Sequence, residues 1–152
     1  MFNPIQEYVV GFLFFNDKKN VILIRKKKPN WQAGKLNGIG GKIENGESPH
    51  QAMIREFLEE TEVDIPTWNL FCKLTVKKPA PAYIYFYKAD SVFHILNHFL
   101  YKKQTNDVGE EIIVRTTSGL INSNEKGIVP NLKWLIPMAM DKDNIVSTVE
   151  ES

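Results

Sequence analysis

Cysteine is almost absent from this sequence, which contains Cys72 alone among 152 residues. A single cysteine cannot form an internal disulfide, and it excludes a zinc site built from several cysteines. Cys72 lies in an apolar, strand-like run and has no neighbouring pattern typical of a catalytic nucleophile. We therefore expect a buried thiol without a chemical role.

The sequence also lacks a long hydrophobic run and a strong excess of either charge. The apolar stretch from residue 8 to residue 15 is far too short to span a bilayer, and the N-terminal residues show no secretory signal pattern. The formal net charge of +1 does not favour a stable complex with nucleic acid or a membrane surface. We expect a cytoplasmic protein of one domain, residues 1–152, whose tail from about residue 141 frays.

Runs rich in β-branched and aromatic residues predict strands on both sides of one central helix. These runs lie at residues 6–15, 20–25, 36–39, 70–76, 83–88 and 112–115. A short helix followed by a strand is expected within residues 91–103. A second helical pattern covers residues 130–140, and Pro137 within it leaves open either a helix start near it or a break. Because strands and helices do not alternate regularly, the pattern predicts an α+β fold with a mixed β-sheet.

Two aromatic features leave alternatives open. Trp31, within the loop of residues 27–35, either packs against the sheet or covers a binding site as a lid. Tyr83, Tyr85 and Tyr87 alternate along one expected strand, so they form a row on one face. That row is either a half-exposed sheet face or a floor on which a nucleobase stacks.

The central helix is expected to begin after Ser48. Serine is a favoured N-cap residue, Pro49 suits the first helical position, and Gln51 stands where a capping box requires Glu or Gln. Apolar residues form one stripe along this helix, and Pro66 prevents its continuation. The apolar stripe is expected to face the sheet, which leaves another side of the helix for polar residues.

Glu56, Glu59 and Glu60 gather on that other side, towards the C-terminal end of the helix. The helix dipole disfavours carboxylates at this end, and like charges three or four residues apart repel one another. This unfavourable arrangement predicts a bound cation, and oxygen ligands suit Mg²⁺ held together with substrate phosphates. Attack of water on a phosphoanhydride is then the expected reaction, with Arg55 orienting a carboxylate.

One set of residues matches a known pattern in both order and spacing: Gly41, Glu47, Arg55, Glu56, Phe57, Glu59, Glu60 and Val63. By this pattern the chain resembles the Nudix hydrolases. The resemblance implies an α/β/α sandwich around a mixed sheet, and pyrophosphohydrolysis that depends on Mg²⁺ or Mn²⁺. Glu62 departs from the pattern, because the family has a glycine there that would end the helix in a left-handed conformation.

Carried over residue by residue, the resemblance implies that Glu56, Glu59 and Glu60 bind the metal together with the Gly41 carbonyl oxygen. Members of the family often add a glutamate from a later loop, and we expect Glu111 in that role. Glu59 and Glu111 are the candidates for the general base. Together with Arg55 and Glu56 they make up the expected catalytic residues.

The stretch from residue 36 to residue 42 resembles the corresponding stretch of MutT-related enzymes, which hydrolyse oxidised purine nucleoside triphosphates. The resemblance implies base recognition by Asn37, with Arg25 projecting into the pocket; the alternative for Asn37 is a strand-end residue bonded to the backbone. Lys42 is expected to stabilise phosphate charge and Tyr85 to stack on the base. In that branch an acidic pair follows a proline, whereas Asn131 follows Pro130 here.

The implied reaction converts a nucleoside triphosphate, of which 8-oxo-dGTP is one example, into a nucleoside monophosphate and pyrophosphate. One alternative is a pyrophosphatase acting on dinucleotides such as ADP-ribose or NADH. Another is a non-catalytic module that binds a nucleotide. In each case the expected partner is a nucleotide, bound by a monomer or homodimer.

Overall fold

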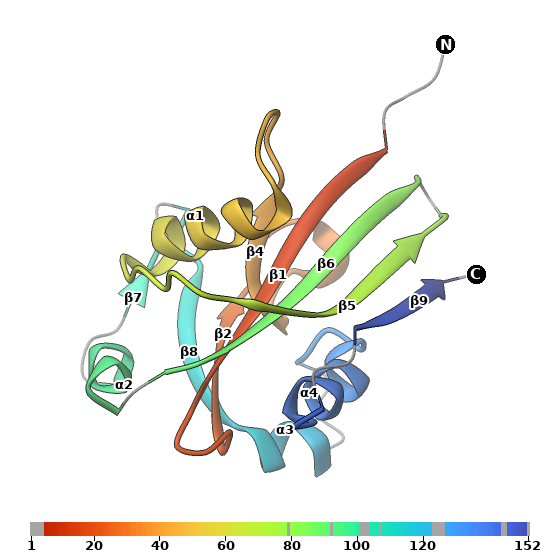
Figure 1. The fold of residues 1–152 in the computed structure, drawn as a ribbon. Coiled ribbons are helices and arrows are strands. Elements are labelled where there is room, and N and C mark those ends of the chain that lie inside the picture. The colour runs from red at the N-terminus through yellow and green to blue at the C-terminus, as the bar shows by residue number, and fades with distance from the viewer. Residues whose placement is uncertain are drawn as a thin grey trace.

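The structure, a computed structural model, describes residues 5–78, 80–91, 93–100, 104–106, 108–122, 127–143 and 146–151. Its named strands are β1 (Gln6–Phe15), β2 (Asn20–Arg25), β3 (Leu36–Asn37), β4 (Ile39–Lys42), β5 (Asn69–Val76), β6 (Ala82–Asp90), β7 (Gln104–Thr105), β8 (Glu111–Thr116) and β9 (Ser147–Glu151). The helices are α1 (Pro49–Thr61), α2 (Phe93–Leu100), α3 (Thr117–Asn122) and α4 (Leu132–Met140), with a 3₁₀ turn η1 (Asn30–Gln32). Figure 1 shows their arrangement.

All of these strands belong to one mixed sheet, in the order β7-β8-β2-β1-β6-β5-β9, with β3 paired to β2 and β4 paired to β1. The long strand β1 divides one of its edges between two partners. Its first half pairs with β4 and its last residues pair with β2, while β6 runs parallel to it along the other edge. This division places β4, and the loop that follows it, beside α1 (Figure 1).

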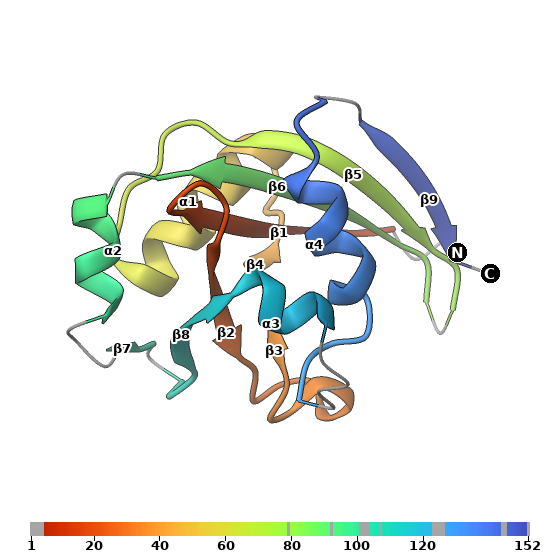
Figure 2. The ribbon, with the colours of Figure 1, turned by 90° about the horizontal axis from the view of Figure 1, so that it is seen from below.

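Helices cover both faces of the sheet, as Figure 2 shows. Beneath α1 and α2 lies one apolar cluster, centred on residues such as Phe15, Phe57 and Trp68. Beneath α3 and α4 lies a second cluster, which includes Phe12, Phe71 and Leu135. Alternate residues of β1 enter the two clusters because successive side chains of a strand point to opposite faces. The predicted α+β sandwich with a mixed sheet is therefore confirmed.

Several local expectations need correction. The tail that was expected to fray contains β9, which pairs parallel with β5 from Cys72 opposite Ser147 onwards. The expected strand 36–39 is split at Gly38, where a Cβ atom would lie 2.6 Å from Val10 Cγ1. Pro137 lies inside α4 without ending it, and the helix α3 was not expected from the sequence.

Cys72 is fully buried, and burial raises the pKa of its thiol to about 11. The expectation of a buried core thiol is therefore confirmed. No helix among the described residues is long and apolar enough to cross a membrane.

Candidate active site

The local sequence fixes where α1 begins and which side it buries. Ser48 Oγ accepts a hydrogen bond from the Gln51 N–H at 3.1 Å, and Gln51 Oε1 accepts one from the Ser48 N–H at 2.9 Å. This reciprocal pair is the predicted capping box. Phe57 is fully buried, and its ring centroid lies 5.1 Å from that of Trp68. The carboxylates of α1 are thereby held on the other side of the helix, towards β4.

Gly41 of β4 lies directly against the carboxylate of Glu56. A Cβ atom at position 41 would stand 2.5 Å from both Cδ and Oε1 of Glu56. Any side chain at this position would therefore displace the carboxylate, which explains why the pattern requires glycine there. The result is that the backbone of β4 and a carboxylate of α1, from separate parts of the chain, lie side by side.

Arg55 connects several of the acidic residues. Its Nε and Nη2 atoms donate to the two carboxylate oxygens of Glu47, at 2.6 and 2.9 Å. Its Nη1 atom donates to Glu56 Oε1 at 2.9 Å and to Glu59 Oε2 at 3.2 Å, while Nη2 also reaches the Lys42 carbonyl oxygen at 3.1 Å. The guanidinium therefore orients three carboxylates at once, as expected for a residue that acts through its neighbours.

These contacts shift the protonation equilibria in opposite directions. The hydrogen bonds from Arg55 lower the pKa of Glu47 to about 2, and the same pair raises the pKa of Arg55. Burial raises the pKa of Glu56, the nearby carboxylates of Glu59 and Glu60 add to this rise, and Arg55 opposes it. The charged form of Glu47 is thus stabilised by its surroundings, whereas burial destabilises the charged form of Glu56.

Glu60 lies at the far end of the same acidic side and meets the loop between β7 and β8. Its Oε2 atom accepts a hydrogen bond from Asn106 Nδ2, which also donates to Glu110 Oε1 at 3.0 Å. Burial raises the pKa of Glu60, and the negative charge of Glu110 contributes to the same direction. Two carboxylates from distant segments are therefore brought together by one amide group.

Glu110 was not singled out from the sequence. It is only 5% exposed, and its Oε2 atom accepts a hydrogen bond from the Lys27 N–H at 2.8 Å and lies 3.5 Å from Lys26 Nζ. Burial alone would raise the pKa of Glu110, but the contacts with Lys27, Asn106 and Lys26 together lower it. The only signal in the sequence was that two glutamates are adjacent at positions 110 and 111.

The donor chemistry of these residues fits a hard divalent cation, because it consists of carboxylate and carbonyl oxygens around the cradle at Gly41. Among the described residues, no group of three or more His, Cys, Asp or Glu side chains is gathered closely enough to hold a metal ion as it stands. In this arrangement Arg55 and Asn106 make the contacts to the carboxylates.

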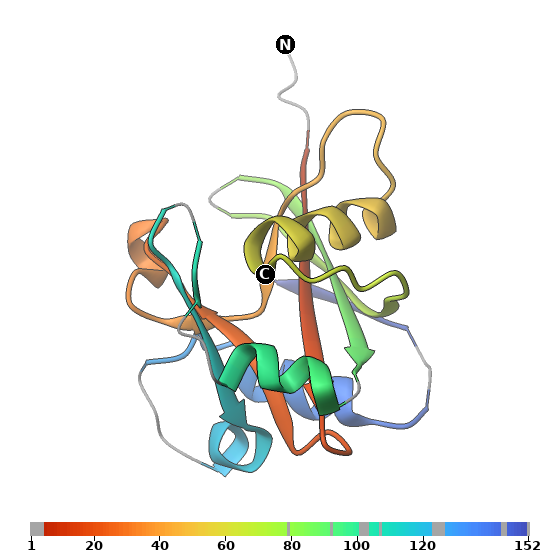
Figure 3. The same ribbon diagram turned by 90° about the vertical axis from the view of Figure 1, so that its left-hand side faces the viewer.

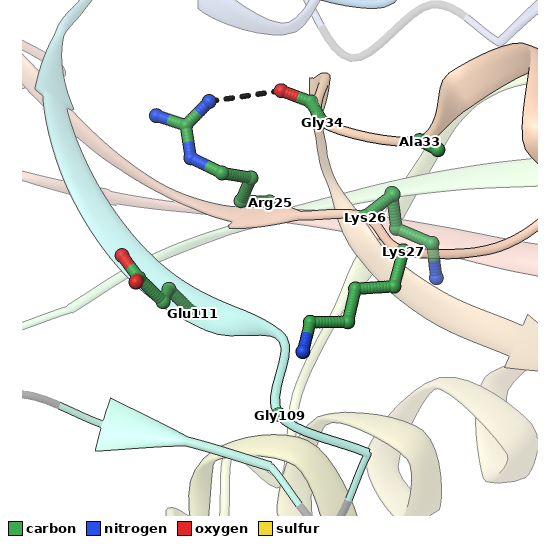
Figure 4. Close-up of a pocket in the computed structure, with 7 residues that line it drawn as sticks. All are labelled: Arg25, Lys26, Lys27, Ala33, Gly34, Gly109 and Glu111. Atoms are coloured by element: carbon green, nitrogen blue, oxygen red, sulfur yellow. Dashed lines mark hydrogen bonds between the residues drawn. The ribbon is translucent and has the colours of Figure 1, made fainter.

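A cavity of about 280 Å³ lies beside this site, between the loop after β2 and the loop before β8. Figure 4 shows its lining: Arg25, Lys26, Lys27, Ala33, Gly34, Gly109 and Glu111. The Arg25 Nη1 atom donates to the Gly34 carbonyl oxygen at 2.9 Å. A Cβ atom at Gly109 would lie 2.7 Å from Lys27 Nζ, so glycine there leaves room for the lysine. The expected ligand Glu111 thus lines this cavity, with Arg25 opposite it in the β2–β8 ladder.

Asn37 and Arg25 lie on different faces of the sheet. In the β2–β3 pair, Asn37 stands opposite Ile24, which belongs to the cluster under α1, and Arg25 stands opposite Leu36, which belongs to the cluster under α4. Asn37 Nδ2 donates to Gln32 Oε1 at 3.1 Å, and Asn37 Oδ1 accepts from the Gly38 N–H at 2.8 Å. The side chain therefore makes local hydrogen bonds, including one to the backbone.

The other residues expected to bind substrate are distributed around the site. The Lys42 side chain is exposed, and Trp31 is 62% exposed on η1, so it does not pack against the sheet. Tyr85 stands opposite Val9, which in turn stands opposite Gly41, so the three form one row across β6, β1 and β4. Asn131 precedes α4, in a segment joined to β3 by the hydrogen bond from the Val129 N–H to the Leu36 carbonyl oxygen, 2.9 Å long.

The tyrosine row is only partly exposed. Tyr87 is 5% exposed and belongs to the core, whereas Tyr83 and Tyr85 are half-buried. Lys73 Nζ lies 4.3 Å from the centroid of the Tyr83 ring. Burial, with a hydrogen bond to Glu7, raises the pKa of Tyr85 to about 12.

Comparison with known proteins gives a consistent family. The NUDIX domain model matches residues 6–138. The chain is 38% identical over 64 residues to the 8-oxo-dGTP diphosphatase of Escherichia coli, which is 42% of this chain and 50% of that protein. It is 46% identical over 46 residues to the oxidized purine nucleoside triphosphate hydrolase of Danio rerio, which is 30% of each. The chain thus spans half or less of the length of these relatives.

Among solved structures, the mutator MutT protein from Bacillus halodurans superposes with a TM-score of 0.72 at 19% identity, covering 97% of this chain and 91% of that one. At this identity the likeness concerns the fold.

Proposed function

Because the chain belongs to the NUDIX family, we propose that it is a nucleoside triphosphate pyrophosphohydrolase of the MutT type, dependent on Mg²⁺ or Mn²⁺. The observation that carries the proposal is that Arg55 holds Glu56 and Glu59 of α1 together with Glu47, while Gly41 of β4 lies directly against the Glu56 carboxylate. The substrate class is suggested by the two relatives named above, an 8-oxo-dGTP diphosphatase and an oxidized purine nucleoside triphosphate hydrolase. The reaction yields a nucleoside monophosphate and pyrophosphate.

Glu56, Glu59, Glu60 and the Gly41 carbonyl oxygen would hold the cation, with Glu110 or Glu111 as the further ligand from the loop. When bound, Mg²⁺ or Mn²⁺ supplies positive charge that offsets the charge of the phosphate oxygens and makes a water molecule more acidic. Glu59 is the candidate general base because its side chain is 57% exposed and reaches solvent. Arg55 then holds this carboxylate in a fixed direction, since it donates to both of its oxygens.

The positively charged cavity supports a nucleotide rather than a neutral substrate. Three basic side chains, those of Arg25, Lys26 and Lys27, line this cavity. Phosphate groups are recognised by such clusters, and Lys42 adds another exposed ammonium on β4 near the acidic site. Asn37, Tyr85 and Asn131 are the proposed base-contacting residues.

The test is an assay of the purified protein with Mg²⁺ and, separately, with Mn²⁺. The substrates are normal and oxidised nucleoside triphosphates, ADP-ribose, NADH and capped RNA, and the products are identified by chromatography. Pyrophosphate released from a triphosphate supports the proposal. AMP and ribose phosphate released from ADP-ribose would instead support the dinucleotide alternative, and no turnover of any compound would support a binding module.

A matched pair of variants connects turnover to the site. Glu59→Gln is expected to lose most activity without unfolding, because it removes the candidate base and keeps the shape of the side chain. Glu150→Gln changes an exposed glutamate of β9 in the same way and is expected to retain full activity. Equal rates for the two variants would contradict the role of Glu59.

A further inference from the structure

We propose that Asn106 is a positioning residue that holds Glu110, rather than Glu111, beside Glu60 as the loop carboxylate of the metal site. The inference rests on the proposed function, since it concerns the same site. It is carried by the contacts of Asn106, by the burial of Glu110 and by the direction in which successive residues of β8 point.

Asn106 uses both ends of its side-chain amide. Its Oδ1 atom accepts hydrogen bonds from the Val108 N–H at 3.2 Å and the Glu110 N–H at 2.8 Å. Its Nδ2 atom donates to Glu60 and to Glu110 Oε1. In addition, the Asn106 N–H donates to the Glu110 carbonyl oxygen at 3.0 Å. One residue therefore closes the turn and holds the carboxylate that the turn carries.

Only an amide of this length meets both requirements. An aspartate at position 106 has no donor for the two carboxylates and would add a third negative charge. A serine could accept from the backbone N–H groups, but its single, shorter hydroxyl group could not donate to Glu60 and Glu110 together. Asparagine at position 106 is thus required for the hydrogen bonds to Glu60 and Glu110 and not only for the shape of the turn.

Strand geometry selects Glu110 over Glu111. Glu111 is the first residue of β8 and stands opposite Arg25, so its side chain lines the cavity shown in Figure 4. Glu110 precedes it by one residue and points the other way, towards α1, since successive side chains alternate. It is 5% exposed and is held from its other side by the Lys27 N–H. Its position beside Glu60 is consequently fixed from two directions.

This arrangement has a consequence for cation binding. Two carboxylates that approach each other without a cation repel, and a donor shared between them offsets that repulsion. Asn106 therefore keeps the loop carboxylate next to α1 before a cation arrives. Groups that orient metal ligands in this way typically contribute about tenfold to 100-fold in metal affinity.

The experiment measures Mn²⁺ binding to the protein alone, without nucleotide, from the electron paramagnetic resonance signal of free Mn²⁺. Asn106→Ala is expected to bind Mn²⁺ about tenfold more weakly than the wild type. Glu110→Gln is expected to weaken binding at least as much, while Glu111→Gln binds like the wild type. Val108→Ala, an exposed position in the same loop, is the matched control and is expected to change nothing.

Circular dichroism and thermal unfolding confirm that each variant is folded. If Asn106→Ala does not fold, Asn106→Ser replaces it, because serine keeps an acceptor for the turn and is still expected to weaken Mn²⁺ binding. Wild-type affinity in a folded Asn106 variant overturns the inference. So does a loss in Glu111→Gln that equals the loss in Glu110→Gln.

The outcome separates this inference from the proposed function. If the wild type turns over no nucleotide but the variants follow the expected order of Mn²⁺ affinity, the proposed reaction fails and the inference stands. If nucleotides are hydrolysed but the order is not found, the inference fails alone. A wild-type protein that binds no Mn²⁺ overturns the inference, and the turnover assay then decides the proposed function separately.

Discussion

Arg55 and Glu47 form a two-pronged ion pair, with Nε to Oε2 at 2.6 Å and Nη2 to Oε1 at 2.9 Å. The pair joins the loop before α1 to the middle of the helix, eight residues along the chain. Both side chains are largely buried, with 14% of Glu47 and 22% of Arg55 exposed. The guanidinium is therefore anchored on one side and free to orient Glu56 and Glu59 with its remaining nitrogen.

Replacing Arg55 with lysine should strongly reduce activity, although the substitution keeps the positive charge. A single ammonium group cannot make the parallel hydrogen bonds to Glu47 and also reach Glu56 and Glu59. We expect kcat for a nucleoside triphosphate to fall about tenfold to 100-fold, the usual effect of losing a group that orients metal ligands. Arg115→Lys on β8 is the matched control, and a similar fall there would show that the effect is not specific to the site.

The Glu47–Arg55 pair should also contribute to resistance against acid. The pKa of Glu47 is lowered from 4.5 to about 2 in the folded protein, so the folded state binds this proton more weakly than the unfolded chain does. The contribution to stability is therefore present above about pH 4.5 and is lost as the pH falls towards 2.

We expect Glu47→Gln to lower the free energy of unfolding at pH 7 and to make it less dependent on pH between 5 and 3 than in the wild type, as measured by urea unfolding. Glu44→Gln provides the control, because Glu44 is 68% exposed and lies 3.8 Å from Arg55. Identical pH profiles for the wild type and Glu47→Gln would contradict this role of the pair.

The parts that could be predicted from the sequence are those that local rules determine. The start of α1 follows from Ser48, Pro49 and Gln51, whose capping contacts involve only neighbouring residues. The acidic side of α1 follows from the helical period. The resemblance to the family rested on residues 41–63, which include this helix and its acidic side.

The parts that could not be predicted depend on strand register. Whether Glu110 or Glu111 reaches α1 depends on the residue at which β8 begins, and a shift by one residue exchanges the two sides. The separation of Asn37 from Arg25 likewise follows from the pairing of β3 with β2. The polar strand β9 forms because β5 offers it a free edge, a long-range property that its own sequence does not show.

Glu62 is the one departure from the family pattern, and its backbone conformation in the structure gives a further prediction. It ends α1 in the left-handed conformation, with φ 63° and ψ 16°, and its N–H donates to the Leu58 carbonyl oxygen at 2.8 Å. Glutamate thus adopts the conformation that glycine would adopt more easily. The geometry of the cap is kept, and the cost is local strain.

Glu62→Gly should therefore stabilise the protein by roughly 0.5–1 kcal/mol, because it removes this strain at a position outside the helix interior. The free energy of unfolding in urea measures the gain, and activity should not change. Glu62→Ala removes the same charge but keeps a Cβ atom, so it should give no comparable gain. If Glu62→Gly and Glu62→Ala stabilised the protein equally, the gain would come from removal of the charge and not from relief of backbone strain.

Glu60 should show a conflict between stability and cation binding. Its pKa is raised in the folded protein, chiefly by burial, so the folded state holds this proton more tightly than the unfolded chain does. The charged form therefore costs stability, and this cost appears as the pH rises through the folded pKa and is absent below about pH 4.5.

In the absence of metal, Glu60→Gln should raise the Tm at pH 7 by roughly 1–4 °C, whereas the exposed control Glu150→Gln should not. Addition of Mn²⁺ should raise the Tm of the wild type more than that of Glu60→Gln, because a bound ion stabilises only the protein that binds it. The order of the two Tm values should therefore reverse at high Mn²⁺. A constant difference at every Mn²⁺ concentration would mean that Glu60 does not bind the cation.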